Sequence, residues 1–238
     1  MKHAIEGLCV PVEYLVLGYL ENNVYVASDG EGTVLVDPSC QAPALLAALD
    51  GRKLDAIFVT HYHSDHTGAL AELREATGAV VYASVQDAPY VRNPRKAGTS
   101  PVPVAAPCEV DVELQDGAVV QVGGMQWRFL HTPGHSLGSG CFYLAAARAG
   151  EAPAGGEGAG AGASQAAATG APVLFSGDTL FCGTTGRTDF KGGSVADMYD
   201  SLAKLSKLPD NVAVLPGHGA FSTIGRERAT TMRKWGVG

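Results

Sequence analysis

Three histidines and one aspartate lie within six positions of this chain, directly after a short apolar run. The run covers 56–59 and is typical of a buried strand. If the chain stays extended beyond it, His61 and His63 point to the same side and can bind one ion. Imidazole and carboxylate ligands together suit zinc, iron or manganese. The cluster, which comprises His61, His63, Asp65 and His66, therefore predicts a metal site at the end of a strand.

The residues that follow predict a helix. Ser64 suits an N-cap, and apolar residues follow it at helical spacing. We expect this helix to run to about Thr77, where Gly78 ends it. Asp65 and His66 would then lie on its first turn, directed toward a second ion.

Length and composition limit the kind of protein. The chain has 238 residues, of which 46% are hydrophobic, so a sizeable core is expected. A net charge of −7 argues against nucleic acid as a partner. The five cysteines are odd in number and form no CxxC pair, which suits reduced thiols. With no signal peptide or membrane span visible, we expect a soluble cytoplasmic protein that binds neither membrane nor nucleic acid.

Short strands and helices alternate along the chain in two series, which favours two packed sheets flanked by helices. We expect the segment 93–107, which contains four prolines, to be a long loop. The expected strands are 12–17, 24–27, 34–36, 56–59 and 80–82 in the first series, and 119–122, 126–130, 141–144, 173–175 and 212–215 in the second. Further helices are expected at 43–49, at 195–206 and after the last strand.

One stretch has an unusual composition. Of the 26 residues in 146–171, 12 are alanine and 7 are glycine. Such a sequence buries too little apolar surface to offset its ordering entropy. We predict a flexible insertion between two strands of a single domain that spans 1–238.

Three more potential ligands follow expected strands. His135, Asp178 and His218 each stand just beyond a strand end, where a scaffold usually presents functional groups. With the first cluster they make seven donors, enough for two metals if one carboxylate bridges them. Asp37 also follows a strand, either as a plain turn residue or as a carboxylate that orients a ligand histidine. His131 and His3 are left outside the site.

These motifs, taken in order, resemble the metallo-β-lactamase superfamily: His-x-His-x-Asp-His, Pro-Gly-His, Ser-Gly-Asp-Thr-Leu-Phe and Pro-Gly-His-Gly. The resemblance implies an α/β fold, a four-layer αβ/βα sandwich with the metals at one edge of the two sheets. It also implies the ligands, with His61, His63 and His135 on the first metal, Asp65, His66 and His218 on the second, and Asp178 between them.

The setting of Asp178 is similar to that in glyoxalase II (hydroxyacylglutathione hydrolase) and its short bacterial relatives. True β-lactamases lack this bridging residue, so antibiotic hydrolysis is not expected. Arg187 falls where glyoxalase II has a basic residue that contacts a carboxylate of glutathione, which implies substrate binding. A structural ion pair with Asp189 is the alternative. The sequence departs from glyoxalase II at Cys182, where a larger or basic residue is expected, and in having only 20 residues after His218.

The segment 186–190, Gly-Arg-Thr-Asp-Phe, also resembles persulfide dioxygenases of the same superfamily. Those enzymes use one iron, with ligands that match His61, His135 and Asp178 here. They retain the other donors of the cluster, so the set of ligands does not separate the two activities.

The expected chemistry follows from the charges. Two divalent ions, zinc first, with iron or manganese as alternatives, would let bound water lose its proton near neutral pH. The resulting hydroxide would attack a thioester, whose thiolate, with a free pKa of about 8.5, leaves readily. Asp65 and Asp178 are the expected catalytic carboxylates, and Asp65 could also shuttle the proton. A lactone or ester hydrolase, the iron-dependent persulfide dioxygenase and a non-catalytic metal-binding module are the alternatives.

Overall fold

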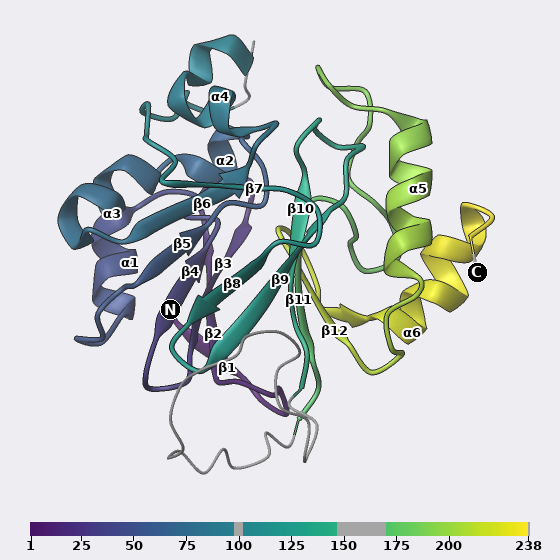
Figure 1. Ribbon diagram of the computed structural model, residues 1–238, viewed down its shortest axis with the longest axis horizontal. Coiled ribbons are helices and arrows are strands. Elements are labelled where there is room, and N and C mark those ends of the chain that lie inside the picture. The colour runs from purple at the N-terminus through teal and green to yellow at the C-terminus, as the bar shows by residue number, and fades with distance from the viewer. Residues whose placement is uncertain (98–101, 147–169, 238) are drawn as a thin grey trace, which may run out of the picture.

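Two β-sheets pack face to face, and helices cover the outer face of each (Figure 1). The computed structural model describes residues 1–97, 102–146 and 170–237. This arrangement is the expected αβ/βα sandwich. Within the described residues, no helix is long and apolar enough to cross a membrane.

The first sheet follows the order of the chain, β1-β2-β3-β4-β5-β6-β7. Its strands pair antiparallel as far as β4 and parallel from β4 to β7. They are β1 His3–Ile5, β2 Val12–Leu17, β3 Asn22–Ser28, β4 Thr33–Val36, β5 Ala56–Phe58, β6 Val80–Ser84 and β7 Val112–Leu114.

The second sheet has the order β13-β12-β11-β10-β9-β8, and in it only β11 and β12 pair parallel. Its strands are β8 Val119–Val122, β9 Met125–His131, β10 Gly140–Leu144, β11 Val173–Gly177, β12 Ala213–Pro216 and β13 Ser222–Thr223.

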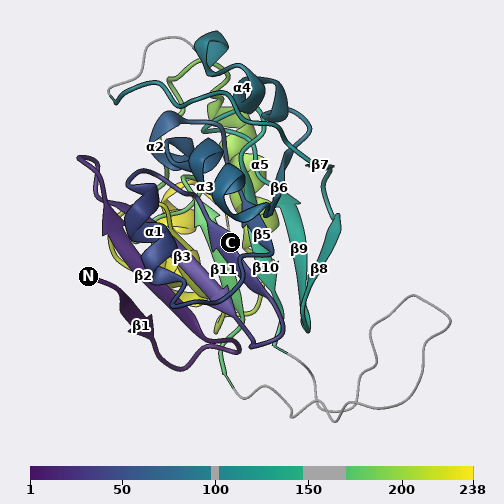
Figure 2. The same ribbon diagram turned by 90° about the vertical axis from the view of Figure 1, so that its left-hand side faces the viewer.

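The helices lie in two groups, one on each sheet (Figures 1 and 2). On the side of the first sheet are α1 Ala42–Ala48, α2 Ser64–Thr67, α3 Leu70–Thr77, α4 Ala88–Arg92 and the short 3₁₀ turn η1 Pro94–Ala97. On the second are α5 Val195–Leu205 and α6 Ile224–Glu227, which continues as a π-helical turn, η2 Arg228–Met232.

An aromatic core fills the space between the sheets. Phe58 of β5 stacks on Phe142 of β10 with ring centroids 4.2 Å apart. Trp127 of β9 meets Phe58 edge-on at 5.7 Å and stacks on Phe175 of β11 at 5.4 Å. These four fully buried rings join both sheets just below the strand ends that carry the site.

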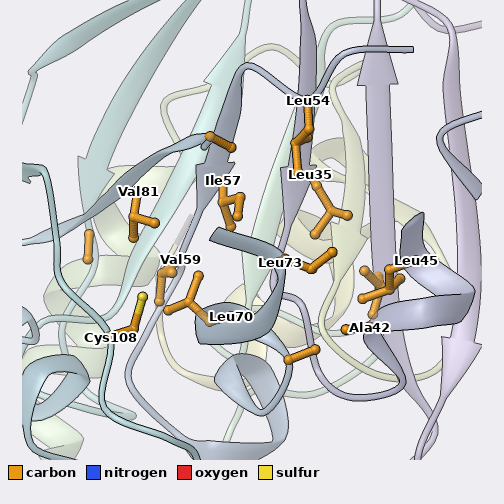
Figure 3. Packing of buried hydrophobic residues seen from close by; sticks show 14 of the residues in the cluster. Leu35, Ala42, Leu45, Leu54, Ile57, Val59, Leu70, Leu73, Val81 and Cys108 are labelled. Atoms are coloured by element: carbon orange, nitrogen blue, oxygen red, sulfur yellow. The ribbon is translucent and has the colours of Figure 1, made fainter. Parts of the chain in front are cut away.

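Successive side chains along a strand point to opposite faces of the sheet, and those on the outer faces pack against the helices. In β4, Val34 and Val36 face the other sheet, whereas Leu35 faces the helices. Figure 3 shows Leu70 and Leu73 of α3 in the cluster that contains Leu35. On the other outer face, α5 contributes a fully buried stripe at helical spacing, made of Met198, Leu202 and Leu205.

Some details of the predicted elements are wrong. The helix expected from Ser64 to Thr77 is two helices, α2 and α3. The helix is interrupted at Ala69, whose amide donates to the Pro38 carbonyl at 2.9 Å. At the preceding Gly68 an added Cβ would lie 2.2 Å from the Ser39 carbonyl oxygen, a contact that only glycine allows. Ser64 is not an N-cap, since His63 holds that position and the Ser64 hydroxyl accepts a hydrogen bond from the Ala105 amide.

Other elements were missed because they are short. The edge strands β1, β7 and β13 have two or three residues each, too few to show a period. The expected loop 93–107 is preceded by α4 and begins with a 3₁₀ turn. The predicted flexible insertion lies outside the described residues except at its ends, and β10 and β11 on either side of it are antiparallel neighbours.

Candidate metal centre

All seven donors predicted from the sequence meet at one edge of the sandwich. They stand where strands of both sheets end, so that side chains distant in sequence face the same space. His61 and His63 follow β5, Asp65 and His66 lie in α2, His135 follows β9, Asp178 follows β11 and His218 follows β12.

Three histidines form the first group, His61, His63 and His135. Their ligand nitrogens all lie within 4.8 Å of one another. Nε2 of His135 lies 2.9 Å from Nδ1 of His63. Nε2 of His61 is buried and has no hydrogen-bond partner among the described residues. A cation at this position would satisfy that nitrogen.

The second group is Asp65, His66 and His218. The Nε2 atoms of the two histidines are 3.3 Å apart. Oδ2 of Asp65 lies 3.4 Å from His66 Nε2 and 3.3 Å from His218 Nε2. Ligands about 2.0–2.1 Å from a tetrahedral zinc ion are about 3.3 Å from one another. The spacing of the group therefore fits a cation in its middle.

Asp178 stands between the two groups. Its Oδ2 lies 3.4 Å from His135 Nε2, and its Oδ1 lies 3.4 Å from His66 Nε2. Oδ1 is buried without a hydrogen-bond partner among the described residues. One carboxylate thus offers an oxygen to each group, which is the arrangement of a bridging ligand.

Asp37 orients His66 directly and His61 through the Thr60 hydroxyl. Its carboxylate accepts hydrogen bonds from the amide and the hydroxyl of Thr60 at 2.8 and 2.7 Å, and from His66 Nδ1 at 2.9 Å. The Thr60 hydroxyl also lies 3.0 Å from His61 Nδ1. Because Nδ1 of His66 is held in this way, its Nε2 faces the centre. Of the two interpretations of Asp37, the structure supports the orienting carboxylate.

Backbone carbonyls fix two more rings. Nδ1 of His135 lies 2.7 Å from the Arg187 carbonyl oxygen, and Nδ1 of His218 lies 2.8 Å from that of Leu20. A carbonyl can only accept, so each Nδ1 carries a proton, and in the neutral ring each Nε2 keeps the lone pair that faces the centre. Both histidines are thus held in the tautomer that a metal ligand needs.

The two groups differ in charge. Burial, together with the neighbouring imidazoles, lowers the pKa of His61 and brings the pKa of His63 to about 4, so both are neutral at pH 7. Burial also opposes protonation of His66, but the carboxylates of Asp178, Asp65 and Asp37 outweigh it and raise its pKa. Their negative charge, which here favours a proton on His66, would equally favour a metal cation.

Sequence reasoning missed Asp87, which joins the two ligand-bearing loops. Its buried carboxylate accepts hydrogen bonds from the Tyr62 amide, between two ligand histidines, and from the Ser136 hydroxyl, next to His135. The Gly138 amide donates a third, at 2.8 Å. Burial raises the pKa of Asp87 to about 6, against the opposing effect of these donors. No local motif marks this residue, because its partners come from distant segments.

Asn22 was also missed, because its sequence is typical of a turn. It begins β3 instead, and its side-chain nitrogen lies 3.1 Å from Asp65 Oδ2. The same nitrogen lies 3.3 Å from Nε2 of both His66 and His218. The Asn22 side chain therefore contacts all three residues of the second group.

Arg187 forms an ion pair with Asp189, which the sequence offered as the alternative to substrate binding. Its guanidinium makes two hydrogen bonds of 2.8 and 2.7 Å to the Asp189 carboxylate and lies over the Phe190 ring, 4.3 Å from its centroid. The two charged side chains are 66% and 65% exposed, so the pair remains open to competition from another anion.

His131, outside the ligand groups as expected, contacts the Leu137 carbonyl oxygen. Cys182 is partly buried.

Gly217 lies against two of the predicted metal ligands, so a substitution there tests how closely these ligands are packed. A Cβ at this position would lie 2.5 Å from both Asp178 Oδ1 and His66 Cε1. We expect Gly217→Ala to lower metal affinity about 10- to 100-fold by pushing these side chains apart, while the chain still folds. Competition with a chromophoric chelator measures the affinity. Gly219→Ala is the matched control, since a Cβ there meets nothing within 4 Å, although its φ of +74° adds strain. Equal affinities in the two variants would contradict the prediction.

Comparisons with known proteins agree with this geometry. A relative from Aquifex aeolicus, described as uncharacterized, is 31% identical over 222 residues, covering 92% of this chain and 94% of the relative. Hydroxyacylglutathione hydrolase from Pseudomonas entomophila is 32% identical over 204 residues. That match covers 84% of this chain but 62% of the enzyme, so the chain spans less than two thirds of its length.

Three solved structures share the fold. BLEG-1 B3 metallo-beta-lactamase has a TM-score of 0.75 and 29% identity, covering 92% of this chain and 97% of that one. TTHA1623 in a di-iron-bound form has a TM-score of 0.72 and 33% identity, covering 92% and 98%. ETHE1 from Myxococcus xanthus has a TM-score of 0.69 and 27% identity, covering 94% and 84%.

The family model that matches is described as the Metallo-beta-lactamase superfamily, and it matches residues 17–150 and 146–218. These ranges include all seven donors and every strand of the two sheets except β1, β13 and all but the last residue of β2. The chain therefore belongs to the metallo-beta-lactamase superfamily.

Proposed function

We propose that this protein is a dinuclear metallohydrolase that cleaves a thioester, such as hydroxyacyl-glutathione or a related thiol conjugate. The observation that carries the proposal is the position of Asp178, which has one oxygen 3.4 Å from each group of histidines. The similarity to hydroxyacylglutathione hydrolase supports the same substrate class.

The seven donors suit a pair of divalent cations, zinc first, with iron or manganese as alternatives. Bound at such a site, divalent cations lower the pKa of water and polarise a carbonyl oxygen. His61, His63 and His135 would hold one, Asp65, His66 and His218 the other, and Asp178 both. His61 Nε2 and Asp178 Oδ1 fit the role of metal ligand most directly, because both are buried and have no hydrogen-bond partner among the described residues.

The remaining steps fall to this chain's own residues. Asp65, held by the Asn22 amide at 3.1 Å, presents a carboxylate that can accept a proton from the attacking water. A thiolate leaves without a strong general acid, because its free pKa is about 8.5. Arg187 could contact a carboxylate on the thiol half of the substrate by exchanging its partner Asp189, since both side chains are exposed.

A second candidate is an iron-dependent persulfide dioxygenase. It is favoured by the segment 186–190, whose Phe190 packs edge-on against His63 and His135 at 5.4 and 5.6 Å. The fold also matches that of ETHE1. In this alternative His61, His135 and Asp178 would hold one iron.

Metal content and three assays on one preparation distinguish the candidates. About two metal ions per chain with cleavage of S-lactoylglutathione would support the hydrolase. One iron per chain with oxygen uptake on glutathione persulfide would support the dioxygenase. A β-lactam is the third substrate, because BLEG-1 shares the fold, and we expect it to remain intact. Full metal loading with no thioester cleavage would overturn the proposal.

A further inference from the structure

We propose that a cavity beside the metal centre binds the acyl half of the substrate and selects an uncharged acyl group. This inference rests on the proposed thioester cleavage. The cavity has a volume of about 330 Å³, which is within the range of small-molecule sites. Its lining comes from the β2–β3 turn, the start of α1, the helices α2 and α3, and the segment 102–105.

The cavity adjoins the second ligand group through two of its lining residues. Asp65 and Asn22 line it, and they are joined by a hydrogen bond of 3.1 Å. A carbonyl placed at the centre could therefore extend one of its substituents into this space without crossing the first group.

The lining determines what fits. None of its described residues is lysine, arginine or histidine. Apart from Asp65, which belongs to the centre, its only charge is Glu72 on α3. The rest are small, apolar or neutral, among them Gly18, Cys40 and Val104. A carboxylate here would lose water and gain no cation, whereas an aliphatic chain would lose only unfavourable contact with water.

The thiol half must then leave on the other side. The first group is bordered there by Phe190, which contacts His63 and His135. The Arg187 guanidinium lies over the Phe190 ring, 4.3 Å from its centroid, and would become available to an anion by exchanging its partner Asp189. The leaving sulfur gains negative charge as the bond to the acyl carbon breaks, and cations favour that charge. This polarity assigns the thiol to the side of residues 187–191 and the acyl group to the cavity.

A pair of substrates tests the assignment. Hexanoyl and adipoyl thioesters of the neutral thiol N-acetylcysteamine differ only in a terminal carboxylate on the acyl chain. We expect the metal-loaded enzyme to prefer the hexanoyl ester by about tenfold or more in kcat/KM. Glu72→Lys should reduce that preference about fivefold by placing a cation in the cavity wall. Glu75→Lys, one turn further along α3 and outside the cavity, should leave it unchanged.

A direct binding measurement separates this inference from the proposed function. Cys40 lines the cavity, so an occupant should slow its alkylation by iodoacetamide, followed by mass spectrometry of the Cys40 peptide. We expect hexanamide to protect Cys40 in the native enzyme and adipamate, its anionic counterpart, to do so only in Glu72→Lys. Protection without any thioester cleavage would support the cavity and overturn the proposed reaction. Cleavage with equal use of both esters, or no selective protection, would overturn the cavity assignment.

Discussion

Replacing Asp178 with alanine is expected to reduce kcat/KM for the thioester by about 10³-fold or more and to leave about one metal ion per chain. Asp178 is the residue whose two oxygens reach both groups of ligands, at 3.4 Å each. Its loss removes a ligand from both positions, and metal-assisted stabilisation of a transition state contributes several kcal/mol. Metal analysis and steady-state kinetics measure the two effects.

Two further variants control for this result. Asp200→Ala removes an exposed carboxylate from α5, far from any ligand in sequence, and should change neither quantity. Asp178→Asn keeps the side chain's shape but not its charge, and should lose the second metal as well. Circular dichroism shows whether each variant folds. If a folded Asp178→Ala retained two metals and full turnover, the bridging role would be wrong.

Phe58→Ala should lower the free energy of unfolding by about 3–5 kcal/mol, a large effect for a single substitution. The Phe58 ring is fully buried between the sheets, where it stacks on Phe142 and meets Trp127 and Tyr82 edge-on. Truncation leaves a cavity that rigid strands on both sides cannot close. Urea denaturation of the metal-free protein measures the loss without a contribution from bound metal.

Val119→Ala is the comparison for this substitution. Val119 lies on β8 and is 54% exposed, so its truncation should cost less than about 0.5 kcal/mol. Similar losses in both variants would mean that the space between the sheets does not dominate stability.

The first cluster could be predicted from sequence, because the spacing of His61 and His63 after an apolar run follows from strand geometry. A position just beyond a strand end is a weaker signal for Asp178, and its assignment as a bridge came from the resemblance to the superfamily. Asp87 and Asn22 carry no such signal, since their roles depend on contacts with residues 25 to 196 positions away. The break between α2 and α3 has the same origin, because the Pro38 carbonyl that accepts the Ala69 hydrogen bond is brought close only by folding.

The same limit applies to Arg187. Its sequence neighbours fitted both an anion-binding residue and a partner of Asp189, and the two assignments differ only in where the guanidinium points. The edge strand β13 was likewise not predicted, because its two residues are too few to show a period.

The donors come from both halves of the sandwich, four from the first sheet's loops and three from the second's. Each of the two proposed groups takes ligands from both halves, so neither group is complete until the halves have docked. Tight metal uptake during biosynthesis would then mark the end of folding, and a chain trapped with its halves apart would bind metal only weakly.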